Sequence, residues 1–125
     1  MIKRFDLEER TTMFSGNIIA LCKLVRPNEI TRPIISQLIR AATSVGANYV
    51  EANNASSKRD FRNKIYICKK ECQETKYWLK LLKLSVHEIG DQAEHLWQEV
   101  HELNLIFQRI ISSTEANLNL EKLKN

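Results

Sequence analysis

Basic side chains are concentrated in residues 58–83, which carry nine lysines and arginines against three acidic residues. When this segment is treated as a helix with Phe61 and Ile65 on its buried side, the cations recur at helical spacing on its outer side. This predicted cationic face comprises Arg59, Arg62, Lys69, Lys70, Lys76, Lys80 and Lys83, with Tyr66 and Tyr77 beside them. The acidic residues of the same segment fall on the other flank, at Asp60, Glu71 and Glu74. Cations can contact phosphates and tyrosines can stack on bases, so nucleic-acid chemistry is expected here.

The charge distribution leaves three interpretations of this face open. Residues 58–83 have a net charge of +6, whereas residues 84–125 have −4 and the whole chain has +4. A lysine-rich helix face is commonly just solvated surface, but such surfaces usually mix both signs. We therefore favour binding of nucleic acid or another polyanion. The alternative function is a protein–protein interaction adaptor that docks an acidic partner on the same face.

Catalytic and metal-binding patterns are absent or weak in this sequence. It contains no G-x-S-x-G nucleophile turn, no phosphate-binding loop and no Glu-x-x-His pair of a di-metal bundle. Cys68 and Cys72 fall on the buried side of their helix, where packing is more plausible than ligation. A polar stripe at Ser44, Asn48 and Glu51 is better explained by solvent or interhelical hydrogen bonds. We expect no catalytic residue, no metal and no cofactor.

The periodicity of apolar residues predicts the elements that position these side chains. Apolar residues recur in alternating three- and four-residue steps in four stretches, and only three glycines and two prolines are present. The predicted helices span about 6–25, 31–55, 58–84 and 91–113, and a fraying helix or polar tail is expected after Ser113. Short connections make successive helices antiparallel neighbours. The expected fold is all-α, an antiparallel up-down-up-down four-helix bundle with residues 1–125 as a single domain.

Local signals mark the helix starts and one close contact. The predicted capping residues are Asp6, Thr31, Ser57 and Asp91. Gly46 stands in the middle of a predicted helix, where glycine costs about 1 kcal/mol relative to alanine. We therefore expect close packing against a neighbouring helix at this position.

The third and fourth predicted helices carry apolar residues beside their main buried seams. These are Ile67, Trp78 and Leu81 on the third helix, with Trp97 and Ile111 on the fourth. They could simply widen the core, which is common in globular bundles. The two helices carry more apolar surface than the core of one small bundle needs. We therefore favour a homo-oligomer with Ile67, Trp78, Leu81 and Trp97 at the subunit interface.

Two features bear on the cellular location. No apolar run is long enough to span a bilayer, and no signal sequence is visible. The three cysteines are an odd number without secretory context. We expect a cytoplasmic protein with no membrane partner.

Several motifs together resemble the bacterial four helix bundle protein family, whose members include proteins encoded in intervening sequences of 23S ribosomal RNA genes. The motifs are Ser44-x-Gly46-Ala47-Asn48-Tyr49-x-Glu51-Ala52, Ser57-x-x-Asp60-Phe61-x-x-Lys64 and Lys70-Glu71-x-x-Glu74-x-x-Tyr77-Trp78-Leu79. Asp6-Leu7-Glu8 and Asn28-Glu29-Ile30 match as well, so the similarity covers nearly the whole chain. Cys68 and Cys72 are not part of the pattern and are interpreted as core substitutions.

The resemblance implies a small bundle that assembles into a ring, with a pentamer as the family arrangement. It also implies a basic surface that contacts nucleic acid. A related group of retroelement accessory proteins looks like the same fold and binds RNA and a reverse transcriptase. The family offers no catalytic residues to transfer. We therefore expect a non-enzymatic oligomeric bundle that binds nucleic acid, RNA more than DNA, through the third helix.

Overall fold

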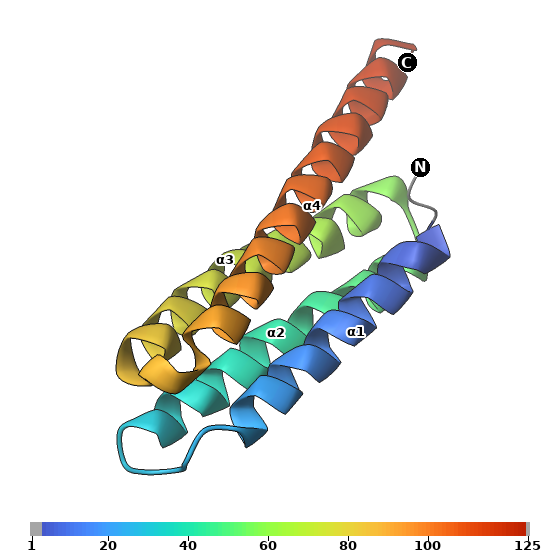
Figure 1. The fold of residues 1–125 in the computed structure, drawn as a ribbon. Helices are drawn as coiled ribbons and strands as arrows, with labels where there is room; N and C mark the ends of the chain where they lie inside the picture. The colour runs from blue at the N-terminus through green and yellow to red at the C-terminus, as the bar shows by residue number, and fades with distance from the viewer. Residues whose placement is uncertain (1–3, 125) are drawn as a thin grey trace.

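Four long helices make up the chain in the computed structural model, which describes residues 4–124 (Figure 1). They are α1 (Arg4–Lys23), α2 (Thr31–Asn53), α3 (Lys58–Ser85) and α4 (Gly90–Lys124), with the short 3-10 helix η1 (His87–Ile89) before α4. Each helix packs against its neighbours in sequence, and α1 also meets α4, so α1 lies diagonally across from α3. The predicted all-α, up-and-down four-helix bundle is confirmed.

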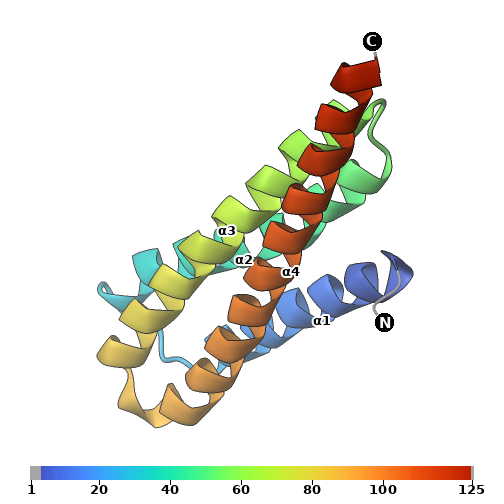
Figure 2. The ribbon, with the colours of Figure 1, turned by 90° about the horizontal axis from the view of Figure 1, so that it is seen from above.

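The four helices do not pack equally closely. Figures 1 and 2 show α1 diverging from α4, whereas α3 lies along both α2 and α4. In both views the C-terminal part of α4 projects beyond the ends of the other helices. The outer surface of α3 is consequently framed by α2 on one flank and α4 on the other.

The core is formed by the apolar seams expected from the spacing. Fully buried side chains include Phe14 of α1, Leu38 of α2, Ile65 of α3 and Phe107 of α4. Two threonines occupy seam positions, and each hydroxyl donates to a carbonyl of its own helix, Thr11 to Glu8 and Thr75 to Glu71. Because these buried hydroxyls are satisfied, they interrupt the apolar seam at little cost.

All three cysteines are free and buried, which confirms the interpretation of Cys68 and Cys72 as core residues. The Cys68 thiol lies 3.5 Å from the carbonyl oxygen of Val45 and donates to it. Burial raises the pKa of Cys22 to about 11 and that of Cys68 to about 12, and it raises the pKa of Cys72 as well. These thiols therefore remain protonated and unreactive near neutral pH.

The helix starts match the predicted capping residues only in part. The Ser57 hydroxyl accepts from the backbone N–H of Asp60 at 3.0 Å, as predicted for α3. Thr31 is not the cap of α2: the Asn28 side chain accepts from the N–H groups of Ile30 and Thr31, and Thr31 Oγ1 accepts from Asn28 N–H. This reciprocal arrangement is a capping box that begins three residues earlier than predicted.

Asp6 and Asp91 lie within the first turns of α1 and α4, because those helices begin at Arg4 and Gly90. A carboxylate in the first turn still interacts favourably with the positive end of the helix dipole. Both carboxylates therefore stand where they favour the start of their helix.

The end of α4 differs most from the sequence-based boundaries. The helix continues past Ser113 to Lys124, where a fraying helix or polar tail was expected. Residues 115–124 are rich in Ala, Leu, Glu and Lys, which are strong helix formers. Glu115 accepts a hydrogen bond from Tyr66, and Glu121 forms an ion pair with Lys58. The start of α3 thus contacts the extension of α4.

Gly46 of α2 packs closely against α1, as predicted from its place in mid-helix. A Cβ atom added at Gly46 would lie 3.2 Å from Thr11 Oγ1 and 3.3 Å from Thr11 Cβ. Such distances are shorter than ordinary van der Waals contact, so a Cβ at this position would require the Thr11 side chain to shift by a few tenths of an ångström.

Candidate nucleic-acid interface

The predicted cationic face of α3 lies on the outside of the bundle, but it turns partly toward α4. Arg59, Lys70, Lys80 and Lys83 are exposed, whereas Arg62, Lys69 and Lys76 are half-buried. The half-buried residues are spaced seven apart, a row that lies next to α4. The expectation that the whole face points away from the core is therefore wrong for these three residues.

Acidic and polar groups of α4 approach this face, although the acidic residues of α3 itself lie elsewhere on the helix. Lys83 Nζ lies 2.9 Å from Glu94 Oε2 in an ion pair, and this contact lowers the pKa of Glu94. Tyr66 donates its hydroxyl proton to Glu115 Oε1 at 3.2 Å. Periodicity within α3 alone could not reveal these groups, because they come from another helix.

Six cations of α3 have no ion-pair partner among the described residues, and two of them, Arg62 and Lys76, donate instead to Asn63 and His101. Arg59, Lys69, Lys70 and Lys80 form no ion pair with any residue that the structure describes. At 1.5 Å per residue, the row they form is about 30 Å long. We call these four residues the free cation row. Tyr77 lies beside it and is 56% exposed, and its ring meets that of Trp78 edge-on.

The acidic residues of α4 divide between its two flanks. Glu99 and Glu102 face α1, where both accept from Arg10 with N···O distances of 2.7–2.8 Å. The hydrogen bond to Glu99 is the main cause of a raised pKa at Arg10. Two of the six acidic residues of α4 are thus directed to α1, whereas Glu94, Glu115 and Glu121 contact residues of α3.

Trp97 and His101 of α4 form a stacked pair that contacts α3. Their ring centroids are 5.2 Å apart with an interplanar angle of 11°. Lys76 Nζ lies 3.0 Å from His101 Nδ1 and 4.7 Å from the centroid of the Trp97 ring. An ammonium group can only donate, so Nδ1 is the acceptor and a neutral His101 carries its proton on Nε2. The spacing of four residues between Trp97 and His101 on one helix is the signal in the sequence for this pair.

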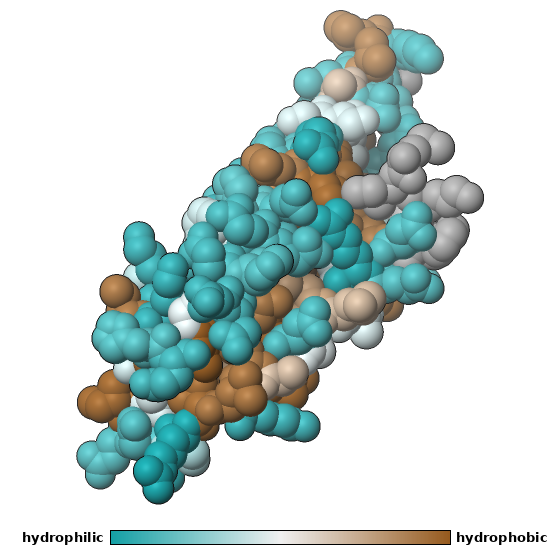
Figure 3. Space-filling model, viewed as in Figure 1, coloured by the Kyte–Doolittle hydropathy of each residue, from teal (hydrophilic) through white to brown (hydrophobic). Residues whose placement is uncertain are grey.

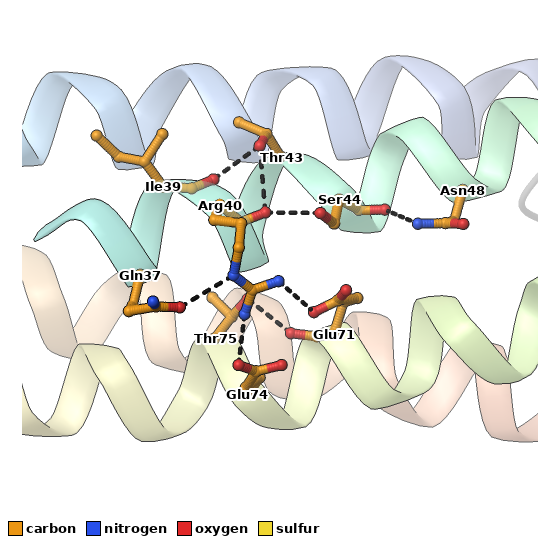
Figure 4. A network of polar contacts seen from close by, with 9 residues as sticks. All are labelled: Gln37, Ile39, Arg40, Thr43, Ser44, Asn48, Glu71, Glu74 and Thr75. Atoms are coloured by element: carbon orange, nitrogen blue, oxygen red, sulfur yellow. Dashed lines mark hydrogen bonds and ion pairs between the residues drawn. The ribbon is translucent and has the colours of Figure 1, made fainter. Parts of the chain in front are cut away.

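On its other flank, α3 is tied to α2 by Arg40, which contacts Glu71 and Glu74 (Figure 4). The Ser44 hydroxyl donates to the Arg40 carbonyl at 2.7 Å, and the Asn48 amide donates to the Ser44 carbonyl at 2.8 Å (Figure 4). These groups bond along their own helix and do not converge on one point. In the polar stripe of α2, Ser44 and Asn48 thus form hydrogen bonds within the helix, and Glu51 forms an ion pair with Lys64 of α3.

The residues predicted for a subunit interface fall into two separate places. Ile67 is 37% exposed, and Trp78 and Leu81 are partly buried. These three share the flank of α3 that carries Glu71 and Glu74 and faces α2. Trp97 is on α4 and contacts Lys76 on the opposite flank of α3. The structure does not bring the four residues into one surface.

Residues 4–124 include no group of three or more His, Cys, Asp or Glu side chains that could hold a metal ion. None of the described helices is long and apolar enough to cross a membrane.

Comparisons with known proteins identify relatives of this chain. The model of the family described as 23S rRNA-intervening sequence protein matches residues 3–109. A solved structure, described as a protein with unknown function from the S23 ribosomal protein family of Bacteroides thetaiotaomicron, is 34% identical with a TM-score of 0.76. The match covers 83% of this chain and 96% of that one. A comparison with curated proteins found no match.

Proposed function

The chain belongs to the 23S rRNA-intervening sequence protein family, and we propose that it is a non-enzymatic, homo-oligomeric bundle that binds RNA through the outer face of α3. The free cation row carries this proposal. A surface cation that already has a carboxylate partner adds little binding free energy when it contacts a phosphate. An unpaired cation can displace the counterions of the nucleic acid and so strengthens binding. The preference for RNA over duplex DNA rests on the exposed Tyr66 and Tyr77 beside the row, because such rings can stack on unpaired bases.

The distribution of aromatic groups supports binding of a flexible strand. Tyr77 is exposed beside the free cation row, and Tyr66 is 42% exposed near its N-terminal end. Bases of single-stranded RNA stack on such rings, and their phosphates meet neighbouring cations. Phosphate contacts of this kind are independent of sequence, so we expect little base preference from the row itself.

Exposed apolar side chains support self-assembly. Ile67 is exposed on the flank of α3 that carries Trp78 and Leu81, the predicted interface residues there. A groove of about 760 Å³ between α1 and α4 is lined by apolar residues that include Met13 and Leu24 (Figure 3). The outer end of α4 exposes further apolar surface at Leu120 and Leu123. A second copy of the chain would cover such surface, and a contact between different patches gives a ring when the rotation that relates the copies closes.

The non-enzymatic part of the proposal is supported by the side chains of α2. The hydroxyl of Ser44 and the amide of Asn48 donate to carbonyls of their own helix, and Glu51 pairs with Lys64 at 3.2 Å. No nucleophile in this stripe has an adjacent base to activate it. The three buried free thiols also support a reducing compartment, the cytoplasm.

Charge reversal of the free cation row tests the proposal. In fluorescence anisotropy with single-stranded RNA, the combined variant Lys69→Glu, Lys70→Glu, Lys80→Glu is expected to lose binding while helicity stays intact. The matched control reverses three exposed cations at and next to the α1–α2 connection, all outside α3: Lys23, Arg26 and Arg32. It is expected to retain binding, because its total charge changes equally but α3 is untouched. Equal loss in both variants would contradict a specific role for α3.

Nuclease treatment separates RNA binding from the adaptor alternative. The protein is captured from a lysate before and after the nuclease. A partner protein that persists after nuclease, together with the absence of RNA binding in anisotropy, would contradict the proposed function.

A further inference from the structure

A pocket of about 440 Å³ lies at the end of the bundle where α3 turns into α4. Its apolar lining includes Leu79 of α3 and Ala93 and Trp97 of α4. Leu84 also lines it and is 67% exposed, so part of the apolar wall is open to solvent. The polar residues around it are Lys80, Lys83, His87 and Glu94. An apolar cavity with one aromatic wall and basic groups around it fits a flat, anionic ligand.

The indole of Trp97 is held in a fixed orientation. His101 stacks on Trp97, and Lys76 fixes His101 through the hydrogen bond to Nδ1. Trp97 is also partly buried against the core. A ring positioned in this way loses little conformational entropy when a second ring stacks on it. Trp97 therefore provides a preorganised stacking surface inside the pocket.

The charges around the pocket are unequal. Lys83 is neutralised by Glu94, which also accepts from Gln98 at 3.2 Å. Lys80 belongs to the free cation row and has no ion-pair partner among the described residues. The pocket is thus continuous with the row, and a strand that follows the row reaches Trp97 at the end of α3.

We propose that this pocket holds one unstacked base of a bound RNA strand, with the indole of Trp97 as the stacking surface and Lys80 beside the adjoining phosphate. The inference rests on the proposed function, because the same row of cations brings the strand to the pocket. It adds a pocket for a base to a face that otherwise offers cations to phosphates and the exposed rings of Tyr66 and Tyr77 to bases. A duplex keeps its bases paired and stacked, so only single-stranded RNA can use the pocket.

The two tryptophans of the chain provide an internal test. Trp78→Phe leaves Trp97 as the only indole, and Trp97→Phe leaves Trp78, which lies on the other flank of α3. Each variant is titrated with a short oligouridylate while anisotropy of the labelled RNA is followed in parallel. We expect quenching of Trp97 emission along the binding curve and no quenching of Trp78. A duplex of matched length is expected to bind without quenching either residue.

Affinity measurements give a second readout. Trp97→Leu is expected to weaken binding of the oligouridylate about fivefold or more and to leave duplex binding unchanged. Trp78→Leu is the matched control, and circular dichroism checks that both variants fold. If Trp97→Leu does not fold, the quenching of the Trp78→Phe variant decides the question.

The outcomes distinguish this inference from the proposed function. Binding without quenching of Trp97 would overturn the pocket and leave phosphate binding by α3 intact. Absence of RNA binding would overturn both. Trp97 emission that changes with protein concentration and not with RNA would mean that another subunit covers the ring, which also overturns the inference.

Discussion

Lys76 of α3 and His101 of α4 are joined by a hydrogen bond of 3.0 Å between Nζ and Nδ1, and the same ammonium lies over the ring of Trp97. This contact divides the lysines of α3 into two kinds. Lys76 is engaged by α4, whereas Lys70, one turn and a half earlier, has no ion-pair partner among the described residues. The structure therefore predicts different roles for two lysines of the same helix.

Replacing these two lysines one at a time tests that difference. Lys70→Met is expected to weaken single-stranded RNA binding and to reduce the salt slope by about 0.7, the contribution of one phosphate contact. Lys76→Met is expected to change the slope little, but to alter Trp97 fluorescence because His101 loses its donor. Anisotropy at several salt concentrations measures both effects. Equal changes in slope would contradict the distinction.

Arg10 is the main polar link between α1 and α4. It makes a bidentate contact with Glu99 and a further bond to Glu102, and its side chain is 28% exposed. Arg10→Met is expected to lower the free energy of unfolding by about 1–2 kcal/mol, because a partly buried bidentate ion pair stabilises the fold more than a surface ion pair does. Hydrogen exchange should rise mainly in α1. Lys58→Met, which breaks the exposed pair with Glu121, is the control and should cost less than about 0.5 kcal/mol.

Gly46 is expected to resist substitution although it stands in mid-helix. Alanine would gain about 1 kcal/mol in helix propensity, but its Cβ would crowd Thr11, whose hydroxyl is held by the Glu8 carbonyl. The expected net effect of Gly46→Ala is a loss of about 1 kcal/mol in urea unfolding. Gly16→Ala is the control, since nothing lies within 4 Å of an added Cβ, and it should stabilise the protein. Equal stabilisation by both changes would argue against the close approach.

The buried thiols predict a loss of stability at alkaline pH. Burial raises the pKa of Cys68 to about 12 from an ordinary value of 9.0, so the folded state holds the proton more tightly than the unfolded state. The resulting contribution of Cys68 to the free energy of unfolding is complete below pH 9, and it is lost as the pH rises toward the pKa of the folded state. Unfolding free energies at pH 8 and pH 10 should differ by less in Cys68→Ala than in the parent. An unchanged difference would exclude this thiol as a cause.

Much of the bundle follows from local sequence. Three- and four-residue steps of apolar residues predict the buried seams, because each helix must bury one stripe and its period is fixed. Ser57 could be recognised as a cap because its side chain acts within three residues. Asn28 was missed because Thr31, at the position predicted to cap, is the reciprocal partner of the true cap.

The surroundings of the cationic face could not be obtained in the same way. The spacing within α3 gives the angle of each lysine about its own axis, but not the groups that a neighbouring helix presents. Glu94, Glu115 and His101 contact α3 because α4 runs beside it in one particular rotation. That rotation depends on packing across the whole core, including the burial of Ile111, which lies off the expected seam of α4.

The salt dependence of RNA binding tests the central claim most directly. If the four residues of the free cation row each contact a phosphate of a single strand, the logarithm of the binding constant falls with a slope of about −2.8 against the logarithm of salt concentration. Binding should then weaken about 50-fold between about 50 and about 200 mM salt. The account predicts this slope for the parent protein and a much smaller one after Lys69→Glu, Lys70→Glu and Lys80→Glu. A parent whose binding is independent of salt, or a slope that the triple variant leaves unchanged, would contradict it.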